Sequence, residues 1–72
     1  MGIKNFIKLH FWQYDNIGST SKKERCILID IDRITTIQEA EKGSIIFIEK
    51  YSEGIPVIET IEEIGNILAF NY

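Results

Sequence analysis

Isoleucine and other β-branched residues dominate the stretch CILIDIDRITTIQEAEKGSIIFIEK, from Cys26 to Lys50, which constrains the fold more than any other feature. Branched side chains lose rotamer freedom in a helix but fit the pleated surface of a sheet. The stretch therefore predicts strands over 26–31, 34–37 and 44–50. Asp32-Arg33 predicts a turn or irregular step, and Lys42-Gly43 predicts a hairpin tip where glycine supplies a positive φ.

The alternation of side chains along these strands predicts which of them are buried. Ile27, Ile29 and Ile31 share one face of their strand. The strand over 44–50 is apolar on both faces in its middle, which is typical of a central, covered strand. Cys26 lies within an apolar strand and is interpreted as a small buried hydrophobic residue. The expected core comprises Ile7, Leu9, Phe11, Ile27, Ile29, Ile37, Ile46, Ile48, Ile61, Ile64 and Leu68.

The segment from Ile3 to Tyr14 also alternates and predicts a first strand. One set of alternate residues is apolar apart from Asn5 and is interpreted as a core face. The other set mixes lysine with aromatic rings, and its members include Phe6, Lys8, His10, Trp12 and Tyr14. The simpler interpretation is that the C-terminal helix or a neighbouring subunit covers these rings. The alternative is a binding face for a partner protein or, less favoured, for bases that stack on the rings.

Two further segments complete the sheet. Residues 16–25 (NIGSTSKKER) are polar and predict a loop, at the tip of a long hairpin that leads into the central strand. Residues 55–58 predict a short strand after a turn over 51–54. Pro56 has no N–H to donate, so this strand is expected at the edge of the sheet or to begin at Pro56. An apolar edge is also a surface on which another chain can pair.

The spacing of apolar residues changes to a helical period after Glu59. Thr60 and Glu63 fit a capping box, and a helix over about 60–69 follows. Gly65 falls on its apolar face and predicts a close approach to the sheet. Phe70 and Tyr72 are expected to dock on the sheet or on a neighbouring chain. The sequence therefore predicts an α+β fold, a mostly antiparallel sheet of about five short strands followed by one C-terminal helix packed on the sheet.

Length and charge limit how such a chain is stabilised and what it binds. We expect one domain over residues 1–72, with a core so small that oligomerisation would stabilise it. One free cysteine and no secretion signal favour a cytoplasmic protein, and the interrupted apolar run over 3–12 predicts no membrane span. The net charge of −3 divides unevenly. Residues 1–36 hold six basic and four acidic residues, and residues 37–72 hold two and seven.

No catalytic, cofactor-binding or metal-binding pattern stands out, and we expect a non-enzymatic module that binds protein and associates with itself. Nucleic acid is the alternative partner, through Lys4, Lys8, Trp12 and the basic residues at 22, 23 and 25, but the net acidity argues against it. The candidate interaction surface comprises Phe6, Lys8, His10, Trp12, Tyr14, Pro56, Phe70 and Tyr72.

Two motifs give the chain a family resemblance. Asp32-Arg33-Ile34-Thr35-x-Ile37 and Val57-Ile58-Glu59-Thr60-Ile61-Glu62-Glu63-Ile64, with the opening Ile7-Lys8-Leu9, resemble the small FlbD-type proteins of flagellar and swarming-motility operons. The resemblance covers about residues 6–69. It implies the same order of strands and helix and no assigned catalytic residues. The chain departs from these proteins in two places. Its loop over 16–25 is longer than their usual short first hairpin, and the aromatic side chains of its first strand are bulkier.

Overall fold

Five antiparallel strands fall into two sheets, and one C-terminal helix follows them. The computed structural model describes residues 5–16, 18 and 20–71, with side chains up to residue 69. The elements are β1 (Phe6–Tyr14), β2 (Lys22–Asp30), the 3-10 helix η1 (Ile31–Arg33), β3 (Ile34–Glu39), β4 (Ser44–Ile48), β5 (Ile55–Val57) and α1 (Ile61–Asn71). The α+β class, the five strands and the final helix are confirmed, and the strands are divided between two sheets.

Strands β1 and β2 form a two-stranded hairpin that is longer than the sequence predicted. Its register runs from the pair Phe6 and Asp30 to the pair Tyr14 and Lys22. The predicted loop over 16–25 is therefore too long at its end, because residues 22–25 pair with β1. Cross-strand pairing overrides the polar composition of this segment.

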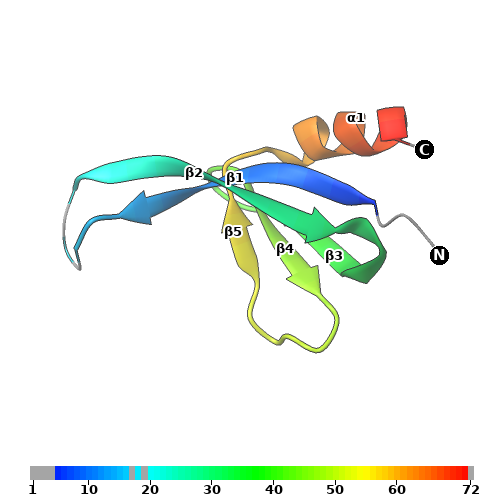
Figure 1. Ribbon diagram of the computed structural model, residues 1–72, viewed down its shortest axis with the longest axis horizontal. Coiled ribbons are helices and arrows are strands. Elements are labelled where there is room, and N and C mark those ends of the chain that lie inside the picture. The colour runs from blue at the N-terminus through cyan, green and yellow to red at the C-terminus, as the bar shows by residue number, and fades with distance from the viewer. Residues whose placement is uncertain (1–4, 17, 19, 72) are drawn as a thin grey trace.

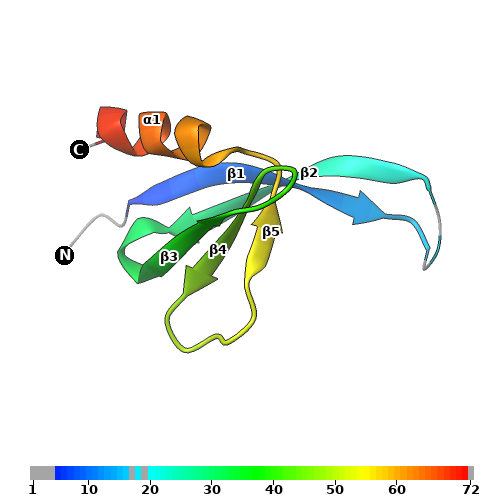
Figure 2. The same ribbon diagram turned by 180° about the vertical axis from the view of Figure 1, so that it is seen from behind.

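The tip half of this hairpin projects away from the other elements (Figures 1 and 2). We call residues 12–26 the hairpin arm, and every residue of it that the structure describes is exposed. The molecule measures 43 Å along its longest axis against 25 and 20 Å along the others. The arm is thus a two-stranded ribbon with both faces in solvent.

The second sheet has the strand order β3-β4-β5. η1 makes the predicted step between the sheets, with the Asp30 carboxylate accepting a hydrogen bond of 3.0 Å from the Asp32 N–H. β3 and β4 form the predicted hairpin, and Gly43 has a φ of +90°. β4 is the central strand and β5 with Pro56 is an edge strand, as the apolar pattern and the proline predicted.

The helix begins at the predicted capping box. The Thr60 N–H donates to Glu63 Oε1 at 3.0 Å, and the Glu63 N–H donates to Thr60 Oγ1 at 3.2 Å. The predicted apolar stripe is wrong in two positions, because Ile61 is 39% exposed and Gly65 has nothing within 4 Å of where a Cβ would lie. Ile64 is 1% exposed, and Ile67 and Leu68 pack beside it. The helix packs on the core through the side that carries Ile67, not the side that carries Gly65, because isoleucine offers more apolar surface to bury than glycine.

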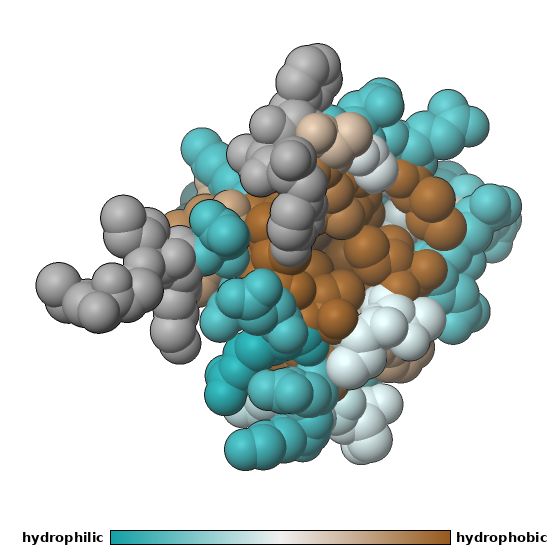
Figure 3. All heavy atoms as spheres, turned by 90° about the vertical axis from the view of Figure 1, so that its right-hand side faces the viewer, coloured by the Kyte–Doolittle hydropathy of each residue, from teal (hydrophilic) through white to brown (hydrophobic). Residues whose placement is uncertain are grey.

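The core lies where the inner face of the hairpin meets the second sheet and α1. Its buried apolar members are Ile7, Leu9, Ile29, Ile31, Ile46, Val57 and Ile64. Residues packed against them include Ile27, Ile34, Ile37, Ile48, Ile55, Ile67 and Leu68. Seen from the end where α1 finishes, apolar side chains gather between hydrophilic ones (Figure 3).

Two other burial predictions were wrong. Cys26 is exposed, since it pairs with His10 on the face of the hairpin turned away from the core. Phe11 is only half-buried, because its partner Arg25 already belongs to the hairpin arm. In the part of the chain that the structure describes, no helix combines the length and apolarity needed to cross a membrane.

Candidate functional site

Exposed apolar side chains concentrate on one face of the hairpin, which we call the outer face. Alternate residues of an antiparallel pair share a face, so the outer face carries Phe6, Lys8, His10, Trp12 and Tyr14 of β1 and Lys22, Glu24, Cys26, Leu28 and Asp30 of β2. Six large apolar side chains are prominently exposed among the described residues, and four of them lie on this face. These four are Phe6, Trp12, Tyr14 and Leu28, at 49, 42, 56 and 63% exposure.

The exposure of these rings decides one question that the sequence left open. Helix α1 does not cover them among the described residues, so that part of the simpler interpretation is wrong. Cover by a neighbouring subunit stays a prediction. The side chain of Phe70 and all of Tyr72 lie outside the described residues.

Lys22 organises the two rings nearest the tip of the hairpin. Its ammonium group lies 4.4 Å from the centroid of the Trp12 ring and 6.0 Å from that of Tyr14. A cation at this range is attracted to the negative face of an aromatic ring. Lys22 was assigned to a loop from the sequence, and its strand register is what places it beside these rings.

A groove of about 530 Å³ lies between the hairpin and the edge of the second sheet, and we call it the edge groove. The hairpin contributes Phe11, Trp12, Tyr14, Lys22 and Ile27 to its lining. The rings at 12 and 14 and the side chains at 11 and 27 come from opposite faces of the ribbon. The groove therefore follows the edge of β1 and wraps around it.

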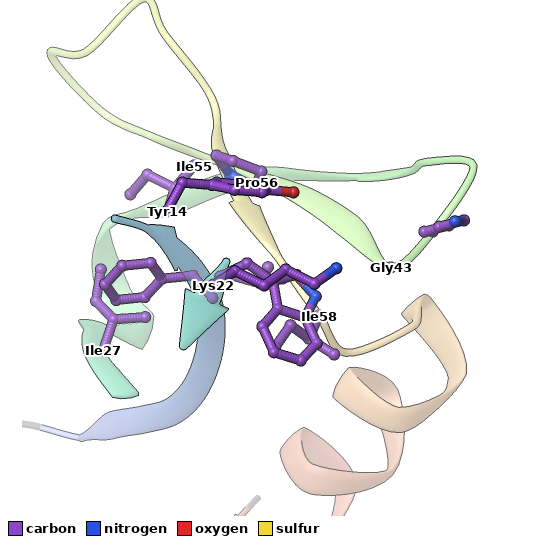
Figure 4. Close-up of a pocket in the computed structure, with 11 residues that line it drawn as sticks. Tyr14, Lys22, Ile27, Gly43, Ile55, Pro56 and Ile58 are labelled. Carbon is purple, nitrogen blue, oxygen red and sulfur yellow. The ribbon is translucent and has the colours of Figure 1, made fainter. Parts of the chain in front are cut away.

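The second sheet supplies the opposite wall through Lys42, Gly43, Ile55, Pro56, Val57 and Ile58. Figure 4 draws both walls, with Tyr14, Lys22 and Ile27 from the hairpin and Ile55, Pro56 and Ile58 from the second sheet and the residue after it. Gly43 lies so close to β5 that a Cβ there would come within 2.1 Å of the Val57 carbonyl oxygen. Glycine at this turn lets the β3–β4 hairpin pack directly against the backbone that forms this wall.

The backbone of β1 opens into the edge groove. The His10 N–H donates to Glu59 Oε1 at 2.9 Å and its C=O accepts from the Ile58 N–H at 2.8 Å, so both groups point away from β2. Backbone direction alternates along a strand, so the N–H and C=O groups of Trp12 and Tyr14 point the same way. Among the described residues, nothing bonds these groups.

His10 and Glu59 join the two sheets and lie next in sequence to residues that line the groove. His10 Nδ1 lies 2.6 Å from Glu59 Oε2, and Nδ1 is the donor because a carboxylate can only accept. The Glu59 side chain is 13% exposed. Burial alone would raise the pKa of the Glu59 carboxyl, but the hydrogen bonds from the His10 ring and N–H outweigh it, so this pKa lies below its ordinary value.

The structure brings together only part of the predicted interaction surface. Trp12, Tyr14 and Pro56 line the edge groove, and the His10 C=O accepts from Ile58, which also lines it. Phe6 and Lys8 lie farther back along β1 and do not line the groove.

Ile58 and Glu59 also belong to the site, and no sequence pattern marks them as functional. Ile58 was assigned only to a short strand, and Glu59 was given no role. The position of Glu59 just before a capping box is only a weak signal for its contact with His10, since the two residues are 49 positions apart.

Comparisons with known proteins assign no function to this site. No protein-family model matches the chain, and searches of curated proteins and of solved structures found no match. The resemblance to FlbD-type proteins stays a prediction. Among residues 5–16, 18 and 20–71, no three His, Cys, Asp or Glu side chains gather as a metal site requires.

Proposed function

We propose that this chain is a small non-enzymatic protein-interaction module that docks protein on its hairpin, a second copy of the chain included. The single observation that carries the proposal is the outer face, where Phe6, Trp12, Tyr14 and Leu28 are all between 42 and 63% exposed. Exposed apolar and aromatic side chains on one face of a protein are typical of interfaces, whose binding hot spots are enriched in Trp and Tyr.

The form of the hairpin arm supports the same proposal. A two-stranded ribbon with both faces in solvent is at best marginally stable on its own. Docking against a protein surface would bury its rings and add roughly 25 cal/mol for each Å² of apolar surface removed from water. A partner would therefore stabilise the arm as well as bind it. An intracellular location, which the free thiol of Cys26 favours, belongs to this proposal.

The distribution of positive charge favours protein over nucleic acid as the partner. Lys22 lies on the outer face of the hairpin, whereas Lys23 and Arg25 lie on the opposite face. Nucleic-acid binding relies on a continuous basic surface, and its affinity falls steeply with salt. We expect self-association through the outer face to change little with salt, because it rests on apolar burial.

The proposal is tested by measuring absolute mass in solution by light scattering across a dilution series. We expect assembly at the concentrated end and a shift toward monomer on dilution. The double variant Phe6→Ala/Leu28→Ala removes apolar surface from the outer face without touching the edge groove. It should shift the transition to at least about tenfold higher concentration.

Tyr51→Ala is the matched control, because Tyr51 is 65% exposed but lies on the loop between β4 and β5. It should assemble like the parent chain. A parent chain that stays monomeric at every concentration would overturn self-association through the outer face. So would an effect of Tyr51→Ala as large as that of the double variant.

A further inference from the structure

We infer that the edge groove binds an extended, acidic segment of a partner protein, which adds as a new strand to the open edge of β1 at Trp12 and Tyr14. This inference rests on the proposed function and names the chemistry of the partner. Strand addition to an exposed sheet edge is a recurring way of recognising peptides, in which main-chain hydrogen bonds supply affinity and side-chain pockets supply specificity.

The first support is the place where β1 changes from a covered to an open edge. At His10, the Ile58 N–H and the Glu59 carboxylate occupy both outward backbone groups. Two residues further on, the same groups of Trp12 face the groove and nothing among the described residues bonds them. An incoming strand would continue the ladder at the point where the chain after β5 leaves it.

The second support is the shape and polarity of the walls beside that edge. Alternate side chains of an added strand point to opposite sides, so every second residue would face the groove. Ile55, Pro56 and Ile58 form an apolar wall for such side chains, and Tyr14 of the hairpin lines the same groove. Apolar residues at alternate positions of the peptide therefore fit this site.

The third support is the sign of the charge. Of the described residues that line the groove, two are lysines, Lys22 and Lys42, and none is acidic. The whole chain carries a net charge of −3, so this is a positive site on an acidic protein. Complementary charge steers the right partner to an interface and disfavours the wrong one. A carboxylate on the bound segment would face these lysines.

The probe is a library of random peptides displayed on phage and selected on the full chain. We expect enrichment of sequences in which apolar residues alternate and Asp or Glu exceeds Lys and Arg. The selected peptides should bind the double variant Trp12→Ala/Tyr14→Ala at least about tenfold more weakly than the parent chain. Absence of enrichment over that variant would overturn the inference, as would enrichment of basic peptides or of a helical apolar period.

Two measurements on the tightest selected peptide separate this mode from general stickiness. Two versions of this peptide are compared, one N-methylated at its odd positions and one at its even positions. One version should bind about tenfold more weakly and the other about as well as before, because only one set of N–H groups would bond β1. Lys42→Glu should weaken binding about tenfold, whereas Lys23→Glu, on the opposite face of the hairpin, should not. The inference would be overturned if both N-methylated peptides lost affinity equally, or if both charge reversals did.

A second copy of the chain is the competing occupant. If peptide bound only below the assembly transition, and excess peptide dissociated the assembly, the groove would belong to the second copy and the inference would fail. Light scattering on Phe6→Ala/Leu28→Ala needs no peptide. It can therefore support the proposed function where the peptide experiment fails. Peptide binding can likewise support the inference where light scattering shows no assembly.

Discussion

The Glu59 carboxylate accepts two hydrogen bonds from His10, one from the backbone N–H at 2.9 Å and one from the ring Nδ1 at 2.6 Å. The neighbouring Ile58 N–H donates to the His10 C=O, and the Ser44 hydroxyl donates to the Glu59 C=O at 2.8 Å. Residues 58 and 59 thus connect the hairpin, the central strand β4 and the start of α1. This junction joins the two sheets.

Glu59→Gln tests the junction through the pH dependence of stability. The pKa of the Glu59 carboxyl is lower in the folded chain than in the unfolded chain. The unfolded chain therefore binds the proton more tightly, and the contribution of Glu59 to stability is complete above its unfolded pKa and is lost as the pH falls through its folded pKa. We expect Glu59→Gln to lower the free energy of unfolding by about 1 kcal/mol at neutral pH.

Urea denaturation at a series of pH values measures this difference. The gap between the parent chain and Glu59→Gln should shrink as the pH falls below the ordinary range of a glutamate. Glu53→Gln is the matched control, because Glu53 is exposed on the loop before β5, and its stability should stay within about 0.5 kcal/mol of the parent. If the difference in the free energy of unfolding between the parent chain and Glu59→Gln were the same at every pH, it would contradict a lowered pKa for the Glu59 carboxyl.

Local patterns in the sequence predicted the elements of the fold well. The alternation at Ile27 and Ile29 marked the core face of β2, and the β-branched composition placed β3 and β4. The turn at Gly43 and the capping box at Thr60 depend on interactions within a few residues, so the sequence carries them directly. Pro56 likewise marked an edge strand, because its missing N–H is a local property.

Contacts between distant segments could not be predicted in the same way. Nothing near His10 in the sequence indicates that Glu59 will bond it, and Lys22 belongs to a stretch whose composition favours a loop. Cys26 lies in an apolar run, yet its side chain is exposed on the hairpin. The edge groove depends on where β1 and β5 separate, which is decided by packing of the two sheets and not by any one segment.

Thr60→Ala tests the capping box at the start of α1. The substitution removes the hydroxyl that accepts from the Glu63 N–H and leaves that donor without its partner. Loss of an N-cap side chain costs about 1 kcal/mol, and we expect a decrease of this size in the free energy of unfolding by urea. Thr20→Ala, in the exposed turn of the hairpin, should change it by less than about 0.5 kcal/mol. Equal losses in the two variants would argue against a capping role for Thr60.

Gly43→Ala and Gly65→Ala should change stability in opposite directions. At Gly43, φ is +90° and a Cβ would come within 2.1 Å of the Val57 carbonyl oxygen, so the substitution adds strain and a clash with backbone. We expect a loss of at least about 2 kcal/mol. At Gly65 a Cβ meets nothing within 4 Å, and alanine should stabilise α1 by up to about 1 kcal/mol. Thermal unfolding followed by circular dichroism measures both, and a destabilised Gly65→Ala would indicate that the helix packs closer to the sheet than described.

Cys26 reports directly on whether the outer face is free or covered. It is the only cysteine of the chain and it is exposed on the hairpin, so a thiol reagent should modify it in the folded state. We expect a rate within about tenfold of that for the same chain unfolded in urea, because an exposed thiol needs no opening of the fold to react. A thiol that reacted only as fast as the chain unfolds would contradict its exposure. If a second copy covers the outer face, the rate should also fall as the protein concentration rises through the assembly transition, and it should not fall for Phe6→Ala/Leu28→Ala over the same range.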